Sequence, residues 1–256
     1  MKEKNSYSRI IQSVAPWEIL RKGEIIEMFQ HCVEQDITTF IHDSYFGRRK
    51  TGELLGTALS ESGLSRDEIQ LISKMPGEEH SGFSMTEAVE NELLQLETDY
   101  IDLFLLRKND LSADNISSVE QLLYQGKIKE IGGIDFEQDQ IEKLSVHFPV
   151  FANFTGLQDF NFIDQEKSKN KMIRLVLLKN VREFGFLKEQ ELVLREIGEK
   201  YNLKPNQVFL AWILNKFPEF HPVISPATED EIKASTDSRH IFFPPKDLVG
   251  INSLFD

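Results

Sequence analysis

Short β-rich segments alternate with amphipathic helical segments along almost the whole chain, and this alternation constrains the fold more than any other feature of the sequence. A strand that is followed by a helix pairs in parallel with the next strand, because the helix returns the chain to the starting end of the sheet. A protein built from separate layers would instead group its strands together in sequence. The pattern therefore predicts an α/β protein with a parallel sheet.

Eight segments are predicted as strands because they are short and rich in β-branched, aromatic and other apolar residues. They are Ser8–Ser13, Ile37–His42, Ile69–Lys74, Tyr100–Leu106, Glu130–Ile134, Val150–Asn153, Arg174–Leu178 and Pro222–Ser225. Helical segments between them place apolar residues three or four positions apart. They are Arg21–Gln35, Thr51–Ser62, Ser84–Leu96, Ile116–Gln125, Gln138–Val146 and Glu189–Tyr201. Pro205 suits a helix start, and Gln207–Phe217 is predicted as an extra helix before the eighth strand.

Eight strand–helix units favour a closed (β/α)8 TIM barrel, with an open, doubly wound parallel sheet as the alternative. No linker rich in Pro, Gly or Ser divides the chain, so residues 1–256 are expected to form a single domain. In a barrel of this kind the functional side chains lie at the C-terminal ends of the strands and in the loops that follow. We call this end the mouth of the barrel, and a functional site is expected there.

The chain is acidic, with a net charge of −13 and an isoelectric point near 5.0, and its basic residues form no stripe. Nucleic acids and anionic membrane surfaces are therefore not expected as partners. The start of the chain lacks a signal-like apolar region, and the apolar run Val208–Leu214 is too short to span a bilayer. The single cysteine, Cys32, falls on the apolar side of a helical pattern and is expected to be buried. We expect a soluble, cytoplasmic protein.

Five segments, taken in order and spacing, resemble the aldo-keto reductase family, and the resemblance extends from Ser8 to about Ser235. They are Thr38–Gly47 continuing through Gly52–Leu59, Ile72–Lys74, Thr98–Leu106, Gly126–Gly132, and Gln207–Leu214 followed by Pro222–Ile224. The resemblance implies a barrel fold. It also implies hydride transfer from NADPH to a carbonyl group, in which the developing alkoxide needs a proton and nearby positive charge.

The family supplies these groups from a tyrosine, a lysine, an aspartate paired with the lysine, and a histidine beside the carbonyl. The resemblance places the lysine at Lys74, but it places the aspartate at Ile41, the tyrosine at Phe46 and the histidine at Arg107. Only Lys74 retains the residue that the family chemistry requires. A register shift does not restore the site, because the residue five positions before Tyr45 is again apolar.

The remaining polar residues near these positions allow two interpretations each. Lys74 is either a ligand-binding cation or a lysine neutralised by Asp43 or Asp135. Arg107 could hold a carboxylate or a phosphate bidentately, or form a surface salt bridge. Tyr45 would reach the site only from a distorted loop, because neighbouring residues of a strand point in opposite directions. His42 is expected to be a structural side chain.

The cofactor positions implied by the resemblance are altered as well. The nicotinamide contacts fall on Ile134, Asp135 and Phe154, and the residues that would bind the 2′-phosphate of NADP(H) fall on Ser225 and Thr228. Glu229 and Asp230 follow directly, and each would oppose a phosphate by roughly 1 kcal/mol or less. We therefore expect weak NADP(H) binding or none. The six histidines show no HxxxH or HxH spacing, so no metal site is expected.

Two functions are consistent with these observations. The first is a catalytically degenerate family member, a pseudoenzyme, that binds a small molecule or a protein at the barrel mouth. The alternative is a divergent NAD(P)H-dependent oxidoreductase that acts on a carbonyl substrate and uses Lys74 with Tyr45 or His42. The difference can be measured, because a ligand that binds the folded protein stabilises it, by about 2.7 kcal/mol at a hundred times its dissociation constant.

Overall fold

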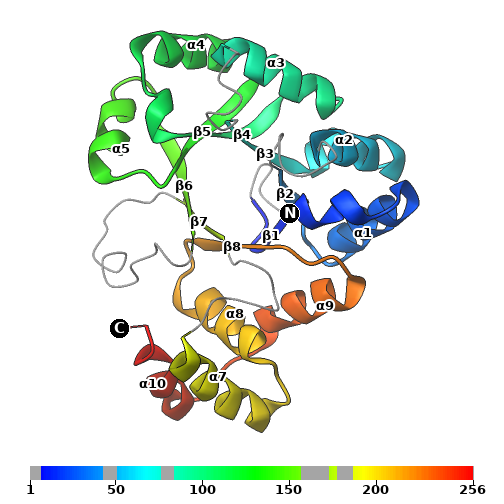
Figure 1. The fold of residues 1–256 in the computed structure, drawn as a ribbon, viewed down its shortest axis with the longest axis vertical. Coiled ribbons are helices and arrows are strands. Elements are labelled where there is room, and N and C mark those ends of the chain that lie inside the picture. Colours follow the sequence, from blue (N-terminus) through cyan, green and yellow to red (C-terminus); the bar gives the residue numbers. More distant parts are fainter. Residues whose placement is uncertain (1–6, 43–50, 76–83, 157–172, 178–186, 256) are drawn as a thin grey trace.

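The computed structural model describes residues 7–42, 51–75, 84–156, 173–177 and 187–255, and their strands form one closed parallel barrel (Figure 1). Each strand pairs with the next along the chain, and β8 pairs with β1. The strands are β1 Ile11–Ser13, β2 Thr39–His42, β3 Gln70–Lys74, β4 Ile101–Leu106, β5 Ile128–Ile134, β6 Val150–Gly156, β7 Ile173–Leu177 and β8 Phe220–Ile224. The predicted parallel α/β architecture is confirmed. The pairing of β8 with β1 excludes the open sheet.

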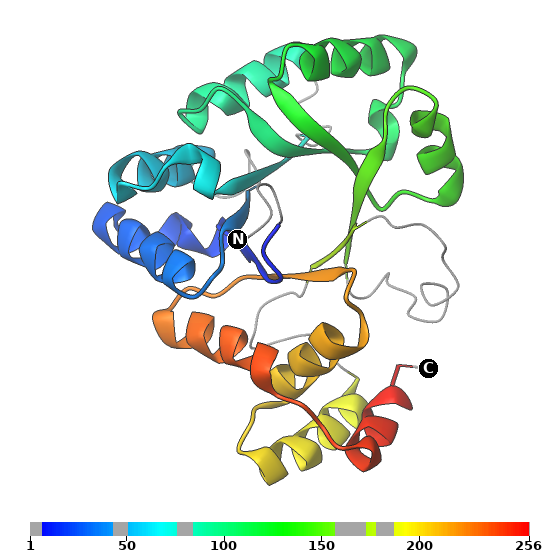
Figure 2. The same ribbon diagram turned by 180° about the vertical axis from the view of Figure 1, so that it is seen from behind.

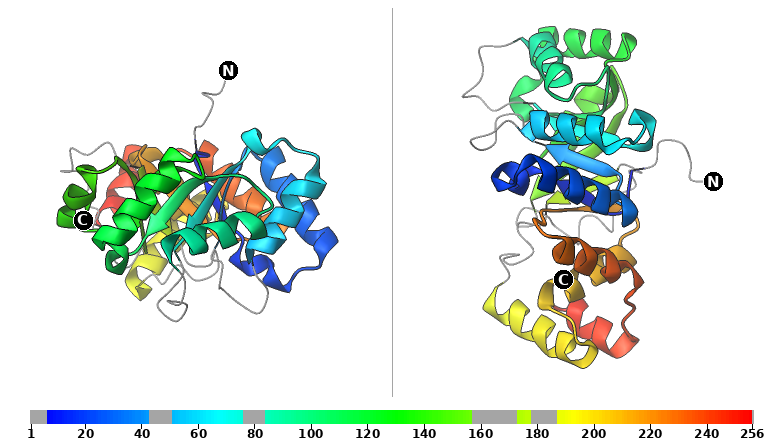
Figure 3. Two further views of the ribbon diagram at one scale, coloured as in Figure 1. Left: turned by 90° about the horizontal axis from the view of Figure 1, so that it is seen from above. Right: turned by 90° about the vertical axis from the view of Figure 1, so that its right-hand side faces the viewer.

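The helices of the described residues cover the outside of this barrel (Figures 1 and 2). They are α1 Lys22–Glu34, α2 Thr51–Ser62, α3 Met85–Gln95, α4 Ala113–Tyr124, α5 Gln138–Ser145, α7 Lys188–Tyr201, α8 Pro205–Lys216, α9 Glu229–Asp237 and α10 Pro245–Asn252. Helices α7 to α10 gather on one side of the barrel beside β8, as Figure 3 also shows. Within the described residues, no helix is both long and apolar enough to cross a membrane.

Local features differ from the sequence-based expectations, chiefly at the ends of elements. Strand β1 begins at Ile11 and not at Ser8, because the Ser8 amide donates to the Thr39 hydroxyl at 2.7 Å and not to a strand carbonyl. Strand β6 runs on to Gly156, where it still pairs with β7. Helices α9 and α10, of 9 and 8 residues, were not predicted from the sequence.

Two apolar layers stabilise the barrel. The outer layer lies between the strands and the helices and includes Cys32 at 0% exposure, so the predicted burial of this thiol is confirmed. The inner layer fills the barrel itself, because alternate residues of each strand point inward. It consists of Tyr7, Ile11, Ile41, Ile72, Leu103, Leu105, Ala152, Phe154, Leu175 and Val223. The barrel interior is therefore a packed core, and a site can form only at its two ends.

Candidate functional site

The described residues at the predicted site positions lie at one end of the barrel, the mouth. Lys74 is the last residue of β3 and is paired with Leu105 of β4, while Ile134 ends β5 and is paired with Phe154 of β6. Because all strands are parallel, their C-terminal ends meet at the same edge. Phe46, Tyr45 and Asp43 lie outside the described residues.

The Lys74 side chain contacts an aromatic ring. Its Nζ atom lies 4.3 Å from the centroid of the Phe154 ring, and Phe154 itself is 6% exposed. A cation at this distance from a ring face is stabilised by the ring quadrupole, by up to about 2 kcal/mol where water is excluded. This contact was not predicted from the sequence, because the two residues are distant in the chain and belong to different strands.

The position that would carry the family's aspartate is part of the apolar core. Ile41 is 1% exposed and is paired with Ile72, within the inner layer of the barrel. Its backbone carbonyl accepts a hydrogen bond of 3.0 Å from the Val14 amide. This side chain can neither pair with an ammonium group nor accept a proton.

Arg107 follows β4 and is held by local hydrogen bonds. Its Nε atom donates to the Met75 carbonyl at 2.9 Å, and its backbone amide donates to the Asp110 carboxylate at 2.7 Å. Within the part of the chain that the structure describes, its guanidinium bonds to a main-chain carbonyl and not to a carboxylate. The surface salt bridge considered for Arg107 is therefore not seen among these residues.

His42 lies on the outer face of the sheet and not in the mouth. Its Nε2 atom is 2.7 Å from the Ser73 hydroxyl oxygen and 3.2 Å from the Glu92 carboxylate of α3. The His42 and Glu92 side chains are 0% and 1% exposed, respectively. A fully buried group bonded in this way between strand and helix is a structural element, as expected for His42, and it cannot contact a ligand in the mouth.

The turn after β5 is fixed by Asn153. The Asn153 side chain accepts from the Phe136 amide at 3.1 Å and donates to the Phe136 carbonyl at 2.9 Å. Asp135, just before it, has a left-handed φ of 52° and donates its amide to the Phe154 carbonyl at 2.9 Å. The side chain of Asp135 is exposed, and Ile134 beside it is apolar. The predicted nicotinamide positions thus present one carboxylate, one aliphatic group and a ring that Lys74 already contacts.

The N-terminus of α9, which follows β8, is occupied by the chain's own groups. The Thr228 hydroxyl accepts from the Glu231 amide at 3.3 Å, and the Glu231 carboxylate accepts from the Ala227 amide at 3.0 Å. Free amides at a helix N-terminus form a natural anion site, and here the Glu231 carboxylate already binds the amide just before the helix. Glu229 and Asp230 add exposed negative charge in the same turn. Ser225 precedes this helix and is partly buried.

Glu231 is a site residue that the sequence reasoning missed. The signal was present, because a threonine followed three residues later by a glutamate is typical of a helix start. A second clamp holds the same loop: the Trp17 indole nitrogen and the Gln12 amide both donate to the Pro226 carbonyl, at 3.3 and 3.2 Å. The peptide group between Pro226 and Ala227 is therefore held at both its carbonyl and its amide. No group of metal-binding side chains occurs among the described residues.

The described strands form a closed parallel barrel covered by helices, and a lysine ends the third strand. This arrangement is that of TIM-barrel proteins, whose functional sites lie at the C-terminal mouth. The model of the aldo/keto reductase family matches residues 15–183, and the chain belongs to this family.

Several curated relatives are reductases. The chain is 29% identical over 171 residues to the glyoxal reductase of Bacillus subtilis, which covers 64% of this chain and 61% of that protein. It is 28% identical over 196 residues to the methylglyoxal reductase DkgB of Salmonella typhimurium, covering 71% and 70%. The uncharacterized oxidoreductase YcsN of Bacillus subtilis matches at 26% over 164 residues, covering 56% of this chain and 54% of that protein. The matches thus span between 54% and 70% of the length of these relatives.

Solved structures share the fold over nearly the whole chain. A thermostable aldo-keto reductase in complex with the inhibitor epalrestat superposes with a TM-score of 0.83 at 18% identity and covers 99% of this chain and 97% of its own. The aldo/keto reductase from Brucella melitensis gives a TM-score of 0.74 at 21% identity, covering 96% and 94%. At these identities the comparison establishes the fold alone.

Proposed function

We propose that this aldo/keto reductase family member does not reduce carbonyl compounds and instead binds a small molecule or a protein partner at the barrel mouth. The observation that carries the proposal is the environment of Lys74. Its ammonium group faces the Phe154 ring at 4.3 Å, and the neighbouring position that would hold a carboxylate carries the buried side chain of Ile41. The family's reaction depends on a lysine that is coupled to an acid and a proton donor.

The cost of these replacements is large. Loss of a positioned general acid lowers a rate by about 10²–10⁴-fold. The resemblance places that acid at Phe46, which has no hydroxyl group, and Ile41 offers no charge to orient Lys74. Lys74 and Arg107 are still basic groups at the mouth. They favour a ligand or a partner surface that carries a carboxylate or a phosphate.

NADP(H) binding is proposed to be weak. The arrangement at the start of α9 supports this, because Glu231 already binds the Ala227 amide, and Glu229 and Asp230 repel a phosphate dianion. A cofactor phosphate at this turn would lie close to three carboxylates.

The alternative is a divergent NAD(P)H-dependent oxidoreductase. The names of the glyoxal and methylglyoxal reductases among the relatives favour it, as does the retention of Lys74. In that case the proton would come from a residue other than His42, whose imidazole is held by Ser73 and Glu92 outside the mouth.

Calorimetric titration with NADPH, combined with absorbance assays on glyoxal and methylglyoxal, separates the two functions. For the wild type we expect no micromolar binding and no NADPH oxidation. Replacing Glu229→Gln together with Asp230→Asn should strengthen NADPH binding by up to about tenfold or somewhat more, because each removed charge contributes roughly 1 kcal/mol or less. The control Glu191→Gln lies in the first turn of α7 and should change nothing. Tight binding with turnover by the wild type would establish the oxidoreductase.

A further inference from the structure

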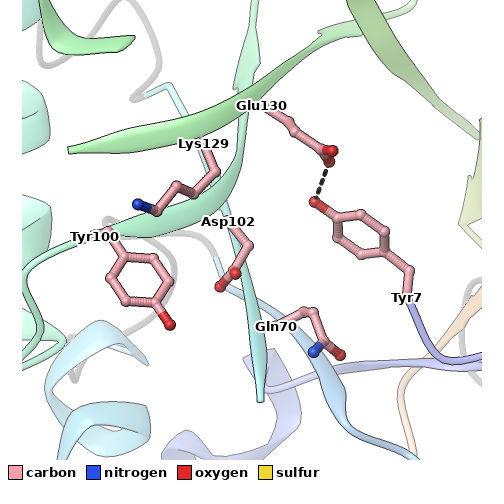
Figure 4. A pocket seen from close by; sticks show the side chains of 6 residues that line it. All are labelled: Tyr7, Gln70, Tyr100, Asp102, Lys129 and Glu130. Carbon is pink, nitrogen blue, oxygen red and sulfur yellow. Dashed lines mark hydrogen bonds between the residues drawn. The ribbon is translucent and has the colours of Figure 1, made fainter. Parts of the chain in front are cut away.

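A pocket lies at the opposite end of the barrel from Lys74. It has a volume of about 220 Å³ and is lined by Tyr7, Gln70, Tyr100, Asp102, Lys129 and Glu130 (Figure 4). Tyr7 precedes β1, Gln70 begins β3, Tyr100 precedes β4, and the others lie in the first residues of β4 and β5. All six are therefore at the N-terminal ends of strands. We call this site the basal pocket.

The basal pocket contains one carboxylate that is paired and one that is not. Asp102 is neutralised by Arg66, whose Nη2 atom lies 2.7 Å from Oδ2, and the same oxygen accepts from the Leu71 amide at 2.8 Å. Glu130 accepts a hydrogen bond of 2.7 Å from the Tyr7 hydroxyl. Among the described residues Glu130 forms no ion pair. Burial and the charge of Asp102 raise the pKa of its carboxyl, and the hydrogen bond from Tyr7 partly offsets this rise. A partly buried carboxylate in this state favours a cationic partner.

Lys129 does not supply that cation. Its Nζ atom lies 4.8 Å from the centroid of the Tyr100 ring. Consecutive residues of a strand point to opposite faces, so the Lys129 and Glu130 side chains diverge from adjacent positions of β5. Figure 4 shows Lys129 directed toward Tyr100 and Glu130 directed toward Tyr7.

Gln70 supplies a second, independent indication of a ligand. This residue is 7% exposed, and its Oε1 atom accepts from the hydroxyls of Thr38 and Thr39 at 3.1 and 3.4 Å. These bonds fix the orientation of the amide, so the Nε2 group faces elsewhere. It donates to no other residue in the described ranges, and Gln70 lines the basal pocket. An amide donor that lines a pocket and has no acceptor among these residues is available to an oxygen atom from outside the chain.

We propose that the basal pocket binds a small amino alcohol. Its ammonium group pairs with Glu130, and its hydroxyl group accepts from the Gln70 amide and donates to Asp102. An amino acid is disfavoured, because its carboxylate would meet the charges of Glu130 and Asp102. A bare metal ion is also disfavoured, since the space is much larger than an ion and the surrounding residues offer two carboxylates only.

The test uses ethanolamine as the probe, with ethylammonium and glycine as comparisons, in calorimetric and thermal-shift titrations of the full chain. We expect ethanolamine to bind saturably, ethylammonium to bind several-fold more weakly because it lacks the hydroxyl, and glycine not to bind. Glu130→Gln keeps the shape of the side chain and the acceptor for Tyr7 but removes the charge. It should weaken ethanolamine binding by about tenfold or more.

The control Glu120→Gln removes one exposed carboxylate far from the basal pocket and should leave the affinity unchanged. Nuclear magnetic resonance shifts at Gln70 and Tyr7 on titration would locate the site. The proposal is overturned if ethanolamine fails to bind the wild type, or if Glu130→Gln binds it as well as the wild type does. Preferential saturation by Mg²⁺, with no response to ethanolamine, would also overturn it. These results are independent of whether NADPH binds at the mouth.

Discussion

Replacing Ile41 with aspartate tests directly whether this position can still serve Lys74. Ile41 is 1% exposed, and its side chain lies in the inner layer of the barrel. Losing this aliphatic group to a small polar one costs about 2–4 kcal/mol of unfolding free energy. The register pairs Ile41 with Ile72, and Lys74 lies two residues further along the same face of β3. Diagonal neighbours of this kind have Cβ atoms about 7–8 Å apart, within reach of a lysine side chain.

The matched variant Ile41→Asn has the same shape as Ile41→Asp and no charge. If the ammonium of Lys74 reaches the new carboxylate, Ile41→Asp should be no less stable than Ile41→Asn at neutral pH. Removing the partner with Lys74→Met should then destabilise Ile41→Asp by a further 3–5 kcal/mol or so, because a buried charge is left unpaired. In the wild-type background Lys74→Met should have a smaller effect than in Ile41→Asp, since it leaves no newly buried carboxylate at position 41 unpaired.

Urea-induced unfolding followed by circular dichroism gives these free energies, and a double-mutant cycle isolates the coupling. A coupling energy near zero between the Ile41→Asp and Lys74→Met changes would refute the geometric reasoning. An Ile41→Asp variant as stable as the wild type would refute the assignment of Ile41 to the core. Either result would mean that the mouth is more open than the packing indicates.

Three further outcomes follow from the structure. Combining Ile41→Asp with Phe46→Tyr and Arg107→His should not restore more than trace NADPH oxidation with aldehydes, and robust turnover by this triple variant would show that the cofactor site is intact. Glu92→Leu should lower the unfolding free energy by about 3–5 kcal/mol, because His42 and Ser73 lose a buried acceptor. The control Glu90→Gln changes an exposed residue of the same helix and should alter the unfolding free energy by less than about 1 kcal/mol. Equal effects of the two substitutions would contradict the buried network. Burial and the nearby Arg9 charge lower the pKa of His221, although its bond to the Ser8 carbonyl opposes this shift. The unfolded chain therefore binds this proton more readily than the folded protein. As a result, stability is lost as the pH falls through about 6.5 and below. His221→Gln should therefore reduce the loss of thermal stability between about pH 8 and about pH 5, and an unchanged pH profile would exclude His221 as a source of it.

Much of the fold was predictable because the signals are local. The helix Thr51–Ser62 was predicted with its observed bounds, and the strands ending at Lys74 and Leu106 were predicted to within one residue at their starts. Apolar periodicity reports which face of an element is buried, and eight repeated units leave few ways to close a sheet. The errors lie at element ends, where side-chain bonds such as that of Thr39 to Ser8 replace strand pairing.

The candidate site was predictable in part. The sequence placed Lys74, Ile134 and Phe154 at strand ends, and parallel pairing brought them to one mouth. It gave no indication that Lys74 would contact Phe154, because that contact depends on the positions of separate strands around the barrel. The Glu231 carboxylate at the Ala227 amide depends in the same way on the exact start of α9.

The sequence by itself determined the parallel α/β architecture and the family, since both are properties of residue type and spacing, and it led us to expect that three of the four catalytic positions are replaced. Only the tertiary structure decided what surrounds the described residues at these positions. It buried Ile41 among inner-layer side chains, held His42 between Ser73 and Glu92, and joined Tyr7 to Glu130 across 123 positions of the chain. Contacts of this kind depend on where closure of the barrel places distant strands, and periodicity along one segment carries no information about that placement.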